Sequence, residues 1–134
     1  MRELPPPSIP KRVFGHQIET QALAFLVERA EGSWKLLARN YFSHRGEIDL
    51  VLEEARPNGR IELVFVEVRM RARAGWVSAL ESVGAEKRRR LQWTARRFLA
   101  AYRGPATSLR FDILGWDGKQ WLHVPNAWSV DGPS

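Results

Sequence analysis

Two acidic residues interrupt segments that otherwise have the apolar pattern of buried strands. Asp49 lies in GEIDLV at residues 46–51, and Glu67 lies in FVEVRMR at residues 65–71. A carboxylate is costly to bury unless a cation or hydrogen bonds compensate its charge. Two such acids in neighbouring strands therefore indicate chemistry that handles positive charge, such as a metal centre.

The periodicity of the strands predicts that these acids converge. Successive side chains of a strand point to opposite faces, so Glu47 and Asp49 share one face, and Glu67 shares a face with Arg69 and Arg71. The opposite faces carry apolar residues: Ile48, Leu50 and Leu52 in the first strand, and Val64, Val66, Val68 and Met70 in the second. If the strands pair with these apolar faces together, the acids and Arg69 lie on the same side of the sheet.

A third acid, Glu19, lies in an amphipathic helical segment. It precedes Ala22, Leu23 and Leu26 by three, four and seven residues, which places it on or beside the apolar stripe. Carboxylates held close together repel one another unless a cation neutralises them. Mg²⁺ suits such a group, because it binds one or two carboxylates together with water and substrate phosphate oxygens. The chain has no cysteine, so a metal would sit on oxygen or imidazole ligands.

Hydrophobic periodicity predicts a mixed α/β fold with the order αβββαββ. Helices are expected over residues 15–30 and from Ser78 or Gly84 to Tyr102, and strands over 34–42, 47–54, 61–71, 109–116 and 121–128. Asn58-Gly59 is a strong hairpin signal between the second and third strands. Leu91, Ala95, Phe98, Leu99 and Tyr102 form the apolar stripe of the second helix.

Length and composition predict one domain. With 134 residues we expect a single domain over 14–130, a Pro-rich basic tail over 1–13 and a short tail over 131–134. No apolar run approaches the ~20 residues that span a bilayer, and the first residues lack the apolar region of a secretory signal. A cytoplasmic location without a membrane partner is the default expectation.

The charge of the chain predicts a polyanionic partner. The net charge is +6, and arginine supplies 17 of the 21 basic residues. Arginine is the side chain whose planar fork suits phosphate contacts. Basic residues cluster in EKRRR, ARR and RMRAR, which favours nucleic acid. The candidate contact residues are Arg45, Arg71, Arg73, Lys87, Arg88 and Arg89. A solvated helix face is the alternative for EKRRR.

The set formed by Glu19, Asp49 and E-V-R at residues 67–69 resembles the PD-(D/E)XK, or restriction-endonuclease-like, nuclease superfamily. More closely, GEIDLV, FVEVRMR, Lys87 and RFD at residues 110–112 look like the YraN-type family of small bacterial proteins, itself similar to archaeal Holliday-junction resolvases. The resemblance runs from Gly15 to Trp128. It implies an αβββαβ core whose central mixed sheet is flanked by two main helices, and a divalent-metal nuclease site.

The resemblance also implies roles for individual residues. Asp49 and Glu67 would bind Mg²⁺ or Mn²⁺, the Val68 carbonyl would be a further ligand, and Glu19 would be an accessory acid. The implied substrate is DNA, possibly branched or structured. A homodimer is compatible with a resolvase-like protein that acts on paired strands.

One position departs from the superfamily pattern, because Arg69 stands where lysine is usual. Lysine can lose a proton and activate water, whereas arginine effectively cannot. Either Arg69 stabilises transition-state charge, or Lys87 supplies the missing amine. The alternatives are a non-catalytic nucleic-acid-binding module and an interaction protein whose basic helix docks an acidic partner.

Several residues have a plainer interpretation. Asp49 and Glu67 could face solvent on a one-sided sheet, which is the interpretation we give to Glu47 and Glu62. The three histidines lack metal-ligand spacing and are assigned no chemistry. The tryptophans are expected in the core or an interface, although Trp76 could stack on a base.

Overall fold

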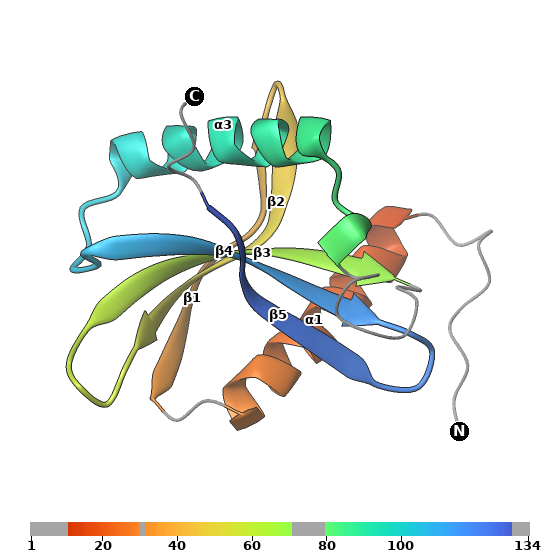
Figure 1. Ribbon diagram of the computed structural model, residues 1–134, viewed down its shortest axis with the longest axis horizontal. Coiled ribbons are helices and arrows are strands. Elements are labelled where there is room, and N and C mark those ends of the chain that lie inside the picture. The colour runs from red at the N-terminus through yellow and green to blue at the C-terminus, as the bar shows by residue number, and fades with distance from the viewer. Residues whose placement is uncertain (1–10, 30–31, 71–79, 130–134) are drawn as a thin grey trace.

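The computed structural model describes residues 11–29, 32–70 and 80–129, and within them five strands form one sheet with a long helix on each face (Figure 1). The elements are α1 (Lys11–Arg29), β1 (Ser33–Ser43), β2 (Gly46–Ala55), β3 (Ile61–Met70), α3 (Ala85–Ala101), β4 (Ser108–Trp116) and β5 (Trp121–Trp128). The predicted mixed α/β class and the αβββαβ order are confirmed. The first helix begins at Lys11 rather than Gly15, so it overlaps the predicted tail; residues 1–10 and 130–134 lie outside the described ranges.

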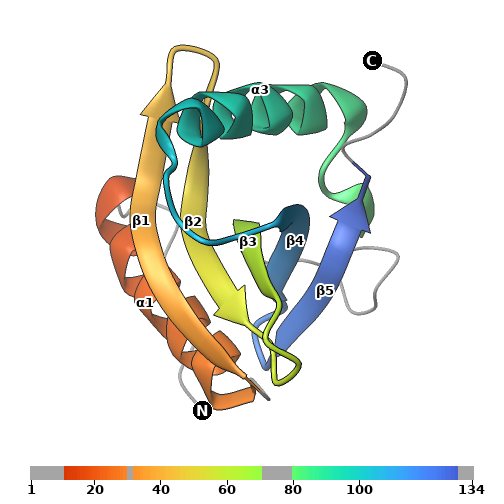
Figure 2. The same cartoon turned by 90° about the vertical axis from the view of Figure 1, so that its left-hand side faces the viewer.

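The strands follow one another in space in chain order, β1-β2-β3-β4-β5 (Figure 2). Pairing is antiparallel from β1 to β3 and from β4 to β5, whereas β3 and β4 are parallel. Parallel neighbours need a crossover, and α3 lies in the connection that returns the chain to the start of β4. No helix in the described part of the chain is long and apolar enough to cross a membrane.

Both faces of the sheet are packed, and each helix covers one of them. The cluster on the α3 side includes Val51, Leu63, Phe65, Leu91, Ala95 and Phe111, and the cluster on the α1 side includes Ala22, Leu26, Leu50, Leu52, Val64 and Val66. This arrangement explains why β3 has an almost continuous apolar sequence, since both of its faces are buried. Burying each Val, Leu or Phe side chain of these clusters contributes about 1.5–3 kcal/mol.

The alternation of β2 is interrupted at its first residues. Ile48 packs in the cluster on the α3 side, whereas Leu50 and Leu52 pack on the α1 side, so the prediction that all three share a face is wrong. Two features accompany the change. Asn40 in the neighbouring β1 has a left-handed backbone with φ 50°, and β2 pairs with β3 only from Leu50 onward. The start of β2 is therefore not held in the β3 ladder.

A network of buried charges lies at the other end of β2. Arg110 of β4 binds Asp112 through Nε at 2.9 Å and Nη2 at 3.1 Å, and its Nη1 binds Glu54 at 2.6 Å and Glu62 at 2.9 Å. Asp112 is fully buried and also contacts His123 Nε2 at 2.8 Å. Glu62 is thus not the simple solvent-facing residue that strand periodicity predicted. The network gives each of the three carboxylates a guanidinium partner inside the fold.

The Asp112 carboxylate is expected to stabilise the fold only while it is ionised. Burial by itself would raise the pKa of Asp112, but His123 and Arg110 hold it below its usual value. The stabilisation is therefore fully present above about pH 4, the unfolded-state pKa, and is lost as the pH falls through the lower folded-state pKa. Asp112→Asn should lower the free energy of unfolding by about 3–5 kcal/mol at pH 7, because it breaks a buried ion pair.

Urea denaturation followed by circular dichroism, at pH 7 and at successively lower pH, measures this effect. Glu81→Gln is the matched control, since Glu81 is an exposed residue. The loss caused by Asp112→Asn should shrink in acid. An equal loss at every pH would show that the carboxylate charge is not the stabilising component.

Candidate functional site

Three carboxylates converge where α1 passes the start of β2. Glu19, Glu47 and Asp49 each offer an oxygen, and these oxygens all lie within 4.8 Å of one another. Glu19 is only 4% exposed, which confirms the expectation that it lies on the apolar side of its helix. The strand contributes the other two acids because alternate residues share a face. The three residues, called here the acid group, form an arrangement that could hold a metal ion.

Asn40 links two members of the acid group. Its Nδ2 donates hydrogen bonds to Glu19 Oε2 at 2.8 Å and to Glu47 Oε2 at 2.6 Å. Neither Asn40 nor Glu47 was predicted at the site, because Glu47 was interpreted as solvent-facing. The available signals were that Glu47 shares the face of Asp49, and that asparagine is unusual in strands but tolerates a left-handed backbone.

Asp49 is joined directly to β3. The Val68 backbone N–H donates to Asp49 Oδ2 at 2.8 Å. Burial raises the pKa of Asp49 well above its usual value, and the negative charges of Glu67, Glu19 and Glu47 raise it further against the effect of that hydrogen bond. A cation would relieve this crowding. The role of the Val68 carbonyl as a ligand stays a prediction.

Glu67 lies beside the acid group but outside the 4.8 Å set. It is 5% exposed, and by strand alternation it shares the α3-side face of β3 with Phe65. Arg69 Nη1 and Lys87 Nζ each lie 3.4 Å from Glu67 Oε2. The strands that carry Asp49 and Glu67 are neighbours, as predicted. Lys87 therefore approaches the predicted site from α3 and meets the same oxygen as Arg69.

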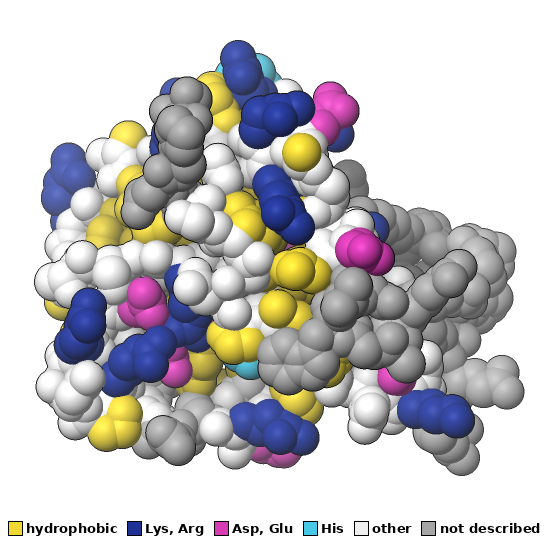
Figure 3. Space-filling model, viewed as in Figure 1, with side chains coloured by type: hydrophobic (Ala, Val, Ile, Leu, Met, Phe, Trp, Pro, Cys, Tyr) yellow, Lys and Arg dark blue, Asp and Glu magenta, His cyan; other side chains and the backbone are white. Residues whose placement is uncertain are grey.

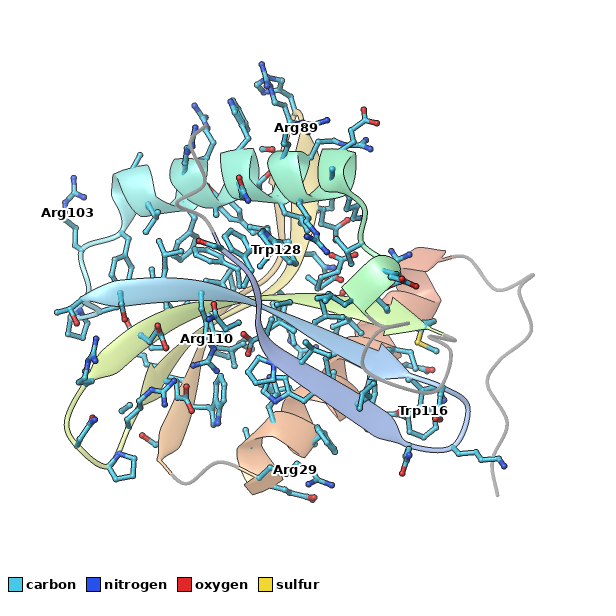
Figure 4. The ribbon with its side chains drawn as sticks, in the orientation of Figure 1. Arg29, Arg89, Arg103, Arg110, Trp116 and Trp128 are labelled. Carbon is cyan, nitrogen blue, oxygen red and sulfur yellow. The ribbon has the colours of Figure 1, made fainter. Side chains whose placement is uncertain are left out.

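A set of exposed arginines covers the outer side of α3 and the β1–β2 turn; this basic face consists of Arg45, Arg89, Arg90, Arg96 and Arg97. Within the described ranges none of them pairs with a carboxylate. Arginine and lysine side chains are visible over the α3 side of the molecule in Figure 3, and Arg89 projects away from the sheet in Figure 4.

Trp93 organises part of the basic face. The guanidinium carbon of Arg45 lies 4.8 Å from the centroid of the indole, and that of Arg97 lies 5.7 Å from it. The turn is also fixed to α3, since Ser43 Oγ and Thr94 Oγ1 are 2.7 Å apart. Arg90 of the basic face lies against Gly46, the residue before Glu47, because a Cβ placed on Gly46 would be 3.6 Å from Arg90 Cβ. The basic face therefore lies close to the start of β2.

Arg88 is held by contacts within the protein, and its predicted contact with nucleic acid stays a prediction. Its Nε donates to the Val83 carbonyl at 2.9 Å, its Nη2 donates to the Leu80 carbonyl at 3.3 Å, and its guanidinium carbon lies 5.3 Å from the centroid of the Trp128 ring. The expectation that Arg88 faces solvent like Arg89 is therefore wrong, because Arg88 secures the segment before α3. Arg71, Arg73 and Trp76 lie outside the described residues.

Removing one charge from the acid group should stabilise the metal-free protein. Asp49→Asn is expected to raise the midpoint of thermal unfolding in EDTA by about 4 °C, the shift that ~1 kcal/mol produces in a domain of this size. The gain should fade as the pH falls through the raised pKa of Asp49, because the wild-type carboxyl is then already neutral. Differential scanning fluorimetry at pH 5 to 8 measures this, with the exposed Glu28→Gln as control. A lower midpoint in EDTA at pH 8 would contradict the crowding argument.

Comparison with known proteins places the chain in a family. A sequence model of the uncharacterised protein family UPF0102 matches residues 18–115. A UPF0102 protein of Burkholderia pseudomallei (strain 1106a) is 41% identical over 121 residues, which cover 90% of this chain and 78% of that protein. A UPF0102 protein of Janthinobacterium sp. (strain Marseille) is 36% identical over 121 residues, which cover 90% of this chain and 91% of that protein. The matched region contains the acid group, Glu67 and α3, and the chain belongs to the UPF0102 family, the YraN-type family that its motifs resemble.

Proposed function

We propose that this protein is a divalent-metal-dependent nuclease that hydrolyses phosphodiester bonds in DNA, with branched or structured DNA as its substrate. The observation that carries the proposal is the convergence of Glu19, Glu47 and Asp49 beside a face of unpaired arginines. Carboxylates can bind a divalent metal ion, and neighbouring arginines can bind the phosphates of the substrate. A metal-assisted phosphodiester site needs both groups.

The donor set fits a hard divalent cation. The acid group offers only carboxylate oxygens, which Mg²⁺ and Mn²⁺ prefer. Asp49 and Glu47 would hold the ion, and Glu19 or Glu67 would supply further negative charge beside it. The chemistry that such an ion supplies is neutralisation of a phosphate oxygen and a lower pKa for a bound water.

The cations near Glu67 would act on the phosphate. A guanidinium effectively cannot give up its proton, so Arg69 can stabilise negative charge but cannot act as a base. Lys87 reaches the same Glu67 oxygen from α3, and its ammonium is the group that could take the place of the usual strand lysine. The basic face would meanwhile hold the DNA backbone through charge-assisted hydrogen bonds.

A non-catalytic nucleic-acid-binding module is the second candidate. The specific observation that favours it is Arg69, which replaces a residue able to lose a proton. Such a protein would keep the acid group and the basic face and would bind DNA without cleaving it.

Three substitutions separate these candidates. Asp49→Asn should abolish Mg²⁺-dependent cleavage, because the site loses a ligand charge. Arg69→Lys should retain metal binding and raise the cleavage rate, since a general acid-base contribution is typically ~10²- to 10⁴-fold. Cleavage of labelled duplex, four-way junction, flap, single-stranded DNA and RNA, with Mg²⁺ or Mn²⁺, measures both effects.

Lys87→Ala tests whether Lys87 or Arg69 contributes to cleavage. Loss of wild-type cleavage in this variant alone would assign the amine role to Lys87 and make Arg69 a bystander. If neither the wild type nor Arg69→Lys cleaves, and both bind nucleic acid in a strongly salt-dependent way, the nuclease proposal is rejected in favour of the binding module. Thermal stability of each variant controls for misfolding.

Charge reversal tests the basic face. Arg89→Glu combined with Arg96→Glu should weaken DNA binding and make the slope of log K against log[salt] shallower by roughly 2, since each lost phosphate contact accounts for ~0.9. Both side chains are exposed, so the fold should be unaffected. Fluorescence anisotropy between 50 and 200 mM salt gives the slope. Arg60→Glu, an exposed change at the β2–β3 hairpin, should alter it little; equal effects there would rule out a localised DNA track.

A further inference from the structure

A cavity lies on the α1 side of the sheet, at the end remote from the acid group. Its volume is about 340 Å³, and its lining includes Arg29, Trp34, Arg56, Arg110, His123 and Asn126. None of these residues belongs to the acid group. Glu54, which also lines the cavity, is five residues from Asp49 along β2, or ~17 Å at the rise of an extended strand. The two sites are therefore separate.

The cavity offers hydrogen-bond donors. Arg110 binds Glu54, Glu62 and Asp112, and the exposed Arg56 also lies 3.1 Å from Glu62. Arg29, the third arginine of the lining, pairs with no carboxylate among the described residues. Trp34 Nε1 is buried without a hydrogen-bond partner among the described residues. An unpaired donor of this kind favours a ligand that brings an acceptor.

The lining also offers flat surfaces and a strained backbone. Trp34 presents an indole beside the Arg110 guanidinium, whose carbon is 5.7 Å from the ring centroid. Asn126 has a left-handed backbone with φ 52°, held by a hydrogen bond of 2.9 Å from its N–H to Asp112 Oδ1. Non-glycine residues in this conformation cluster at ligand-binding sites.

We propose that this cavity binds a nucleotide through its phosphate monoester. Arg29 and Arg56 at the exposed rim contact the phosphate, and the indole of Trp34 with the Arg110 plane receives the base. The volume lies in the range of small-molecule sites, ~300–1,000 Å³. The same chemistry is present in a free nucleoside monophosphate and in the 5′-phosphorylated end of a strand. The inference does not depend on the acid group or on nuclease activity.

Isothermal titration calorimetry in EDTA tests the proposal with defined probes: AMP, adenosine, inorganic phosphate, and one short oligonucleotide with and without a 5′-phosphate. AMP should bind more tightly than adenosine or inorganic phosphate, because only AMP offers both the base and the phosphate. If the 5′-phosphorylated oligonucleotide binds more tightly than both its 5′-hydroxyl form and AMP, the site recognises strand ends. If AMP binds and the two oligonucleotides do not differ, the site recognises free nucleotides.

Matched variants locate the binding. Arg29→Gln combined with Arg56→Gln should weaken AMP binding about 10-fold or more, since charge-assisted hydrogen bonds to phosphate are lost. Trp34→Phe should weaken it less, because a ring remains. The Arg56 side chain is 45% exposed, and Glu54 and Glu62 still pair with Arg110 when Arg56 is changed, so the fold should persist.

Arg103→Gln and Asp49→Asn are the controls and should bind AMP like the wild type, because Arg103 does not line the cavity and donates to the Ala100 and Tyr102 carbonyls, and Asp49 belongs to the acid group. No AMP or 5′-phosphate binding at millimolar concentration would overturn the proposal. Binding that survives the double arginine change but is lost in Arg89→Glu would also overturn it, by moving the site to the basic face.

Discussion

The point at which β2 leaves β3 is the constraint on which the site depends. If β2 had continued in register, strand alternation would have placed Ile48 with Leu50 in the α1-side cluster. The left-handed Asn40 lies opposite this interruption in β1, and the same residue supplies the amide that joins Glu19 to Glu47. One asparagine thus combines an unusual backbone with the contact between helix and strand. Without it, the hydrogen bond from the Val68 N–H to Asp49 would remain, but Glu19 and Glu47 would lose their common donor.

The two clusters of acidic residues have different kinds of partner. Glu54, Glu62 and Asp112 each have a guanidinium partner inside the fold. Glu47 and Asp49 instead meet an amide and a backbone N–H, which donate hydrogen bonds but carry no net charge. The first cluster therefore has cationic partners, whereas Glu47 and Asp49 have none among the described residues. This difference separates a structural cluster from a candidate metal centre.

The sequence predicted the elements well because their signals are local. Apolar periodicity and Asn58-Gly59 defined the helices, strands and hairpin to within a few residues, and the parity of β3 correctly placed Val64 and Val66 opposite Phe65. The partners of the acids were harder to predict. Asn40 acts through an unusual backbone angle, and Arg88 turns back onto carbonyls; neither follows from residue type and spacing.

Long-range pairing explains the remaining differences. Glu62 and Arg110 are distant in sequence, and their contact follows from the parallel pairing of β3 and β4, which the hydrophobic pattern does not specify. His123 was assigned no chemistry because its spacing to other histidines is uninformative, although its partner is a carboxylate on the adjacent strand. Contacts across a sheet depend on register, and register is fixed by the whole fold.

The position of Lys87 on α3 has a mechanical consequence. The helix that carries this ammonium to Glu67 also carries four of the five arginines of the basic face, and Ser43 and Thr94 fasten the fifth to the same rigid body. Lys87 and Arg97 are ten residues apart, or ~15 Å along the axis. A displacement of α3 therefore moves the basic face and the Lys87 ammonium together. In this architecture the position of the exposed arginines and the Lys87–Glu67 distance cannot be adjusted independently.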